Sequence, residues 1–204
     1  KYDWSVTIKI IEKLYENREK ISDKIEVAIS KFQDNSKIVS FLIFYGKYDV
    51  PIEVRQDPIT LQERENVLKR EVAIAFPLDT NENLLTKPIG KLYGGLYSFL
   101  PLEEVRTGAK FLIQADFLVQ PGREGMRWDV KWNKWLIEKI SEVAIESIRY
   151  FQKRPKNPKW REQYLPLFEF EELYDDFYKR LVKPILRYRV TQELKDPLVP
   201  RLRD

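Results

Sequence analysis

The sequence contains neither cysteine nor histidine. Without cysteine the chain has no disulfide framework, thiol nucleophile or thiolate metal site, and without histidine it has no imidazole base or serine–histidine triad. The seven glycines offer little material for a phosphate-binding loop, and neither GxxxxGK[ST] nor GxGxxG occurs. We therefore expect no metal site, and any catalysis would have to use Asp, Glu, Lys, Arg or Tyr.

Long hydrophobic runs are also missing. No apolar stretch approaches the roughly 20 residues of a membrane span, and the start of the sequence does not resemble a signal peptide. Hydrophobic residues make up 43% and charged residues 33% of the 204, which is typical of a globular protein. We expect a soluble, cytoplasmic protein. The abundant Lys, Glu and Arg, with twelve prolines and one methionine, favour a thermophilic source.

Positive charge is concentrated near the end of the chain. Residues 149–204 carry a net charge of +5, whereas residues 1–148 carry −1. Basic and acidic blocks alternate there, a pattern that fits either solvated, mutually paired faces or a nucleic-acid surface. The residues of such a surface would be Lys153, Arg154, Lys156, Lys159 and Trp160. Trp160 would stack on a base or, alternatively, anchor the proline-rich linker to the body of the protein.

The first two thirds of the chain read mainly as strands. Alternating or densely apolar segments predict strands at 4–11, 38–45, 51–55, 71–78, 91–102 and 111–119. Apolar residues at three-to-four spacing predict a helix at 22–32, capped by Ser22, and a short helical segment is expected within 57–69.

Two helices are expected after the strands. Asp129 can cap a long amphipathic helix that reaches Phe151, and a second helix is expected from Phe170 to Arg189, kinked at Pro184. The fold class is therefore α+β: a twisted mixed sheet with a long packed helix and a C-terminal helical extension. We divide the chain into a lead-in at 1–36, an α+β domain at 37–152, and a linker with the extension at 153–204.

A proline–glycine turn precedes the long helix. The run Gln120-Pro121-Gly122-Arg123 fits a type II turn, which would present Arg123 outward from a rigid mount. The guanidinium group suits phosphate, because it is planar, donates several hydrogen bonds and keeps its charge. The alternative is a surface ion pair between Arg123 and a carboxylate, either Glu124, Asp116 or Asp129. Lys87 and Lys91 could touch phosphate or be ordinary turn lysines.

Residues 87–140 carry a family resemblance. They read KPIGKLYGGLYSFLPLEEVRTGAKFLIQADFLVQPGREGMRWDVKWNKWLIEKI. The succession FLPL…TG…F…ADF…R…WN resembles the sacsin-like branch of the GHKL ATPases, in the transducer-type domain that follows the ATP-binding domain. More distantly, FLVQPGRE followed by a long helix resembles the loop of the heat-shock chaperones in the same superfamily, and this likeness implies that Arg123 senses the γ-phosphate of ATP, with Gln120 beside it. Here glutamine stands where an asparagine is usual, and Pro121-Gly122 is an insertion.

The resemblance also implies a function. The chain would be the transducer or middle domain of a larger ATPase, and would couple ATP binding and hydrolysis to chaperone-like remodelling. ATP and Mg²⁺ would be held by the missing ATP-binding domain, whose last strand would be residues 4–11, and the chain alone would not hydrolyse ATP. That domain is the expected partner, and a homodimer is left open. The alternatives are a nucleic-acid-binding module of a mismatch-repair-like or topoisomerase-like ATPase, and a protein-interaction scaffold.

Overall fold

The computed structural model describes residues 11–34, 37–86, 95–121, 125–153 and 155–195, and the strand expected at 4–11 lies almost wholly outside these residues. A seven-stranded sheet in the order β1-β2-β3-β4-β7-β5-β6 is its centre. Neighbouring strands are antiparallel, except that β5 and β7 run parallel. The strands are β1 (Ile11–Lys20), β2 (Ile25–Asp34), β3 (Lys37–Asp49), β4 (Lys69–Leu78), β5 (Gly95–Ser98), β6 (Leu100–Arg106) and β7 (Leu112–Gln114).

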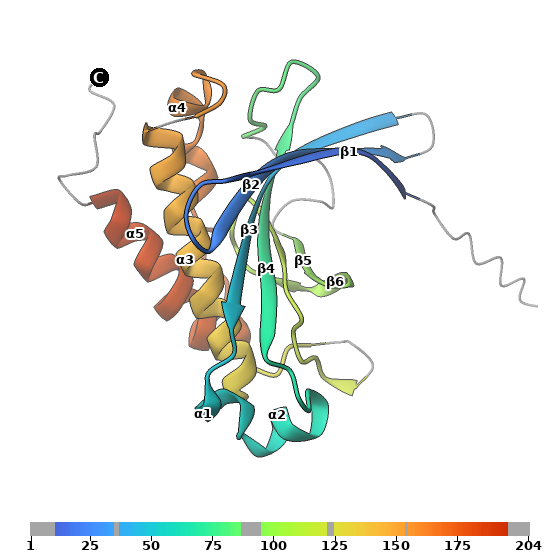
Figure 1. Cartoon of the computed structure of the whole chain (residues 1–204). Coiled ribbons are helices and arrows are strands. Elements are labelled where there is room, and N and C mark those ends of the chain that lie inside the picture. Colours follow the sequence, from blue (N-terminus) through green and yellow to red (C-terminus); the bar gives the residue numbers. More distant parts are fainter. Residues whose placement is uncertain (1–10, 35–36, 87–94, 122–124, 154, 196–204) are drawn as a thin grey trace, which may run out of the picture.

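The long helix α3 (Lys131–Lys153) lies across one face of the sheet, beside α5 (Tyr188–Lys195), as Figure 1 shows. Alternation along β4 turns Val72, Ile74 and Phe76 toward the helices, and all three are buried. The Phe76 ring packs against Phe44 and Phe151 with ring centroids 5.4–5.9 Å apart. The α+β class, the mixed sheet and the long packed helix are thereby confirmed.

The helix expected at 22–32 is wrong, because residues 25–34 form strand β2. Ile25, Val27 and Ile29 also alternate at a spacing of two, and all three are buried. The strand pairs with β3 over its whole length, from Ile25 opposite Gly46 to Asp34 opposite Lys37. Ser22 lies in the turn between β1 and β2, where its amide donates to the carbonyl of Ile25. Hydrogen-bonded pairing with β3 therefore decides the structure of this segment, although its apolar residues also show helical spacing.

The strand expected at 51–55 is also wrong, since helix α1 (Ile52–Arg55) occupies that segment. Pro51 precedes the helix, and its carbonyl accepts from the Arg55 amide at 3.0 Å. The expected short helix within 57–69 is confirmed as α2 (Pro58–Glu63), which Asp57 caps by accepting from the Thr60 amide.

Two later strands differ from expectation. The single strand predicted at 91–102 is a hairpin of β5 and β6 joined at Phe99, which has a positive φ of 61°. Residues 87–94 lie outside the described residues, and so do Lys87 and Lys91. The strand predicted at 111–119 pairs only over β7, and its last residues leave the sheet toward α3.

The C-terminal region packs into the same hydrophobic core as the sheet. It contains α4 (Trp160–Gln163), a 3₁₀-helix at Leu165–Phe168, a π-helix at Tyr178–Arg187 and α5. The helix expected from Phe170 begins later, because Asp175 accepts from the Tyr178 amide at its start. Pro184 lies inside the π-helix, so the expected irregularity takes the form of a widened turn. Within the described residues, no helix has the length and hydrophobicity needed to cross a bilayer.

Candidate functional site

The segment Ala115–Val119 leads from β7 to the turn that contains Arg123, and its base is buried. Asp116, Phe117 and Leu118 are at most 5% exposed. Strand β5 supports it from one side: the Ala115 amide donates to the Tyr97 carbonyl at 3.1 Å, and the Ser98 hydroxyl donates to the Phe117 carbonyl at 3.1 Å. A buried chain segment held in this way is a rigid starting point for a loop.

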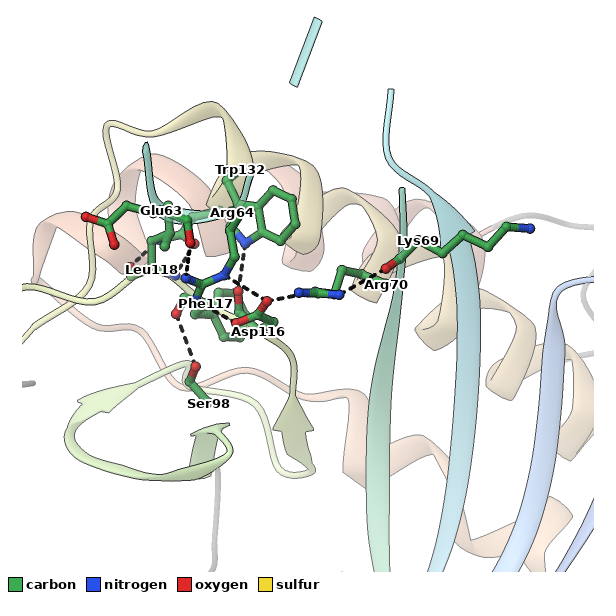
Figure 2. A network of polar contacts seen from close by, with 10 residues as sticks. Glu63, Arg64, Lys69, Arg70, Ser98, Asp116, Phe117, Leu118 and Trp132 are labelled. Carbon is green, nitrogen blue, oxygen red and sulfur yellow. Dashed lines mark hydrogen bonds and ion pairs between the residues drawn. The ribbon is translucent and has the colours of Figure 1, made fainter. Parts of the chain in front are cut away.

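A buried carboxylate at Asp116 binds two arginines that come from other elements (Figure 2). Arg64, just after α2, donates from Nε to Oδ2 at 2.8 Å and from Nη2 to Oδ1 at 2.7 Å. Arg70, on β4, donates from Nε to Oδ2 at 2.7 Å. A charge removed from water must be paired and hydrogen-bonded, and three charge-assisted bonds meet that requirement. The cluster therefore joins α2, β4 and the segment after β7.

The first turn of α3 holds the same segment from the opposite side. The Trp132 indole Nε1 donates to the Asp116 carbonyl at 2.7 Å, as Figure 2 also shows. The side-chain Oδ1 of Asn133 accepts from the Leu118 backbone amide at 2.9 Å, and its Nδ2 donates to the carbonyls of Leu118 and Arg127, both at 2.7 Å. Because Leu118 and Arg127 flank the turn on either side, one buried side chain fastens both of its ends.

The turn itself closes as a narrow hairpin. Val119 and Met126 form an isolated antiparallel bridge, and the Gln120 amide donates to the Gly125 carbonyl at 2.9 Å. A Cβ added at Gly125 would lie 2.9 Å from the Gln120 side-chain oxygen, so the absence of a side chain at Gly125 leaves room for the Gln120 side chain beside it. Gln120 is exposed. Arg123 lies between these two ends but outside the described residues.

We name this arrangement the loop mount: Asp116 with Arg64 and Arg70, plus Trp132 and Asn133. It holds no pair of carboxylates suited to acid–base chemistry, and the described residues contain no group of three or more potential metal ligands. What it provides is a fixed base for the residues 119–126. Asp116, one of the carboxylates considered as a partner for Arg123, already binds Arg64 and Arg70. The long helix begins at Lys131, two residues after the expected capping residue Asp129.

The predicted nucleic-acid residues are only partly brought together. Lys153, Lys156 and Lys159 are exposed around the linker that follows α3, and Arg154 lies outside the described residues. Trp160 is fully buried, and its Nε1 donates to the Glu82 carbonyl at 2.7 Å. Trp160 therefore anchors the linker to the body of the protein, the alternative to base stacking, and its buried indole is not presented to a nucleic acid.

The loop mount contains residues that the sequence reasoning missed. Arg64 and Arg70 lie 52 and 46 residues before Asp116, and no local spacing connects them with it. A signal did exist for the remainder: a lone Asp inside an otherwise apolar run, and a Trp-Asn pair at the start of a helix. All three of these residues belong to the ADF and WN motifs, and the fold places Trp132 against Asp116 and Asn133 against Leu118, two residues further along.

Comparison with known proteins gives one partial match. The chain is 31% identical over 98 residues to Protein NO VEIN of Arabidopsis thaliana. The match covers 45% of the chain and 3% of that protein, so the chain corresponds to a small part of this relative. No protein-family model and no solved structure matches the chain.

The hydrogen bonds of Asn133 to Leu118 and Arg127, which we call the Asn133 clamp, give a first prediction. Replacing Asn133 by Ala removes three hydrogen bonds and leaves the buried amide of Leu118 without its partner, whereas the Leu118 carbonyl keeps a longer bond from the Arg127 amide at 3.4 Å. We expect the free energy of unfolding to fall by about 2–3 kcal/mol in urea denaturation. The exposed Asn81, whose side chain takes no part in the core, is the control and should change stability by less than about 0.5 kcal/mol when replaced by Ala. Equal effects of the two substitutions would show that the clamp contributes nothing.

Proposed function

We propose that this chain is the transducer-type domain of a larger GHKL ATPase of the sacsin-like branch, coupling ATP binding and hydrolysis to conformational change. The observation that carries the proposal is the loop mount. Arg64 and Arg70, which are distant in sequence, hold Asp116 before the turn that contains Arg123, and Asn133 of α3 bonds to both ends of that turn. A turn anchored so firmly is suited to present a cation at one defined place, as binding of a phosphate on another domain requires.

The residue types of this chain indicate which part of the parent protein would bind ATP and which part would contact its third phosphate. This chain has no glycine-rich phosphate cradle, so another domain of the parent protein would bind ATP and Mg²⁺. Arg123 would reach across to the third phosphate and Gln120 would lie beside it. The guanidinium would stabilise the negative charge that develops on the transferring phosphoryl group. Arg123 would have a binding partner only while the third phosphate is present. Docking of the two domains would therefore depend on which nucleotide is bound. Chaperone-like remodelling is the task we assign to the parent.

Hydrogen exchange of the parent polypeptide tests this function. We expect amides within 115–127 to exchange more slowly with a non-hydrolysable ATP analogue than with ADP. Docking would suppress the transient opening of the turn through which these amides exchange. The Gln120 amide, which donates to Gly125, is the most informative one. Peptides from α5 serve as the internal control and should not change. Identical exchange at 115–127 with the ATP analogue and with ADP would contradict the proposal.

A further inference from the structure

The hairpin of β5 and β6 ends in an exposed apolar tip. Phe99, the single residue between the two strands, is 77% exposed, and the next residue, Leu100, is 62% exposed. Pro101 is exposed as well. Large apolar side chains at a turn gain little from folding, because the water around them is not displaced. Such a tip is unusual for a β-hairpin, whose turn residues are mostly glycine, asparagine or aspartate.

The backbone at the tip is strained. Phe99 has a φ of 61°, in the left-handed region that a bulky side chain rarely adopts. Glycine would take this conformation without strain and would expose no apolar surface. Phenylalanine therefore strains the hairpin and gains no burial in return. Strain of this kind is typical of residues that act in recognition.

The tip lies next to the loop mount. Tyr97 pairs with Gln114 in the parallel ladder, and the Ser98 hydroxyl donates to the Phe117 carbonyl, a contact visible in Figure 2. Gln120 follows Phe117 by three residues, or about 10 Å of extended chain. A protein surface that covers the Gln120 turn would therefore also meet the hairpin tip.

Strand β6 is an edge of the sheet, where a partner strand could pair with it. Pro101, next to the tip, has no amide hydrogen and makes such pairing unfavourable at this point. Contact at the tip would then come from side chains. The geometry fits a projecting apolar group that enters a pocket.

We propose that Phe99 is a docking residue that inserts into an apolar pocket on the ATP-binding domain of the parent protein. This inference rests on the proposed function, because that function names the domain that faces the turn. The apolar contact fixes the position of the domain, while Arg123 contacts its nucleotide. Docking then needs two features of this chain, one that recognises protein and one that recognises phosphate.

Photo-crosslinking in the full-length parent tests the contact directly. With p-benzoylphenylalanine in place of Phe99 and an ATP analogue bound, irradiation is expected to link this position to a peptide of the ATP-binding domain. Tyr174, an 80% exposed aromatic residue outside the hairpin, is the matched position and should give no such product. Links from position 99 only to other parts of the parent, or no links at all, would overturn the proposal.

Substitution separates docking from folding. Phe99→Gly relieves the strained φ and is expected to raise the melting temperature of this chain by about 1–3 °C while lowering ATP turnover of the parent about tenfold. Phe99→Leu should keep most of the turnover, since it preserves an apolar side chain. A merely structural role would lower stability and activity together, and this result would overturn the proposal. The effect of Arg123→Ala on ATP turnover tests the proposed function separately from the Phe99 contact.

Discussion

Replacing Asp116 by Ala is expected to lower the free energy of unfolding by about 3 kcal/mol. The substitution removes a carboxylate that is 5% exposed and accepts three hydrogen bonds from Arg64 and Arg70. Breaking a buried ion pair typically costs about 3–5 kcal/mol, because the partner charge is left unpaired. We expect the low end of that range, since the side chains of Arg64 and Arg70 are 23% and 32% exposed and can recover some hydration.

An exposed ion pair provides the control for this measurement. Glu171 accepts from Arg106 at 2.6 Å, but both side chains are more than half exposed. Glu171→Ala should therefore change stability by less than about 1 kcal/mol. Urea denaturation of both variants measures the difference. If Asp116→Ala were no more harmful than Glu171→Ala, the loop mount would not be the rigid base that we describe.

Elements with a single consistent pattern could be predicted from the sequence. The apolar face of α3, from Trp132 to Phe151, fits only a helical period, and every residue assigned to that face is buried. The dense run at 38–45 and the alternation at 71–78 likewise predicted β3 and β4. In each of these segments, local preference and tertiary packing favour the same structure.

Elements with two compatible patterns could not be predicted in this way. Residues 25–32 place apolar side chains at both helical and strand spacing, and only the ten-residue pairing with β3 decides between them. The hairpin tip at Phe99 was missed because its turn chemistry is unusual. The segment 91–102 was predicted as one strand, but the chain reverses within it at a phenylalanine with positive φ.

The site was predictable only at its centre. The turn at 120–123 could be recognised from Pro-Gly and from the position before a helix. Its support could not, because Arg64 and Arg70 reach Asp116 across about 50 residues of sequence. Contacts of this kind depend on sheet order, and β7 lies beside β4 only because the chain crosses over between them.

Arg123→Ala is expected to lower ATP turnover of the parent protein by about a hundredfold or more. The arginine would act on the charge that develops as the third phosphate is transferred, so its loss raises the barrier of the chemical step. Nucleotide affinity should barely change, because the other domain would make the ground-state contacts with ATP. Gln120→Ala should have a smaller effect, since the glutamine would only support the contact and carries no charge.

Turnover and nucleotide affinity of the parent, each with and without Arg123→Ala, are therefore the quantities to measure. Arg127 offers a matched control, because it follows the same turn and is half-buried, and only its backbone carbonyl enters the Asn133 clamp. The expected result is a loss of turnover of about a hundredfold for Arg123→Ala at nearly unchanged affinity, with Arg127→Ala close to the unaltered protein. If turnover and affinity are both unchanged in Arg123→Ala, Arg123 is a surface ion-pair residue and the turn does not reach nucleotide.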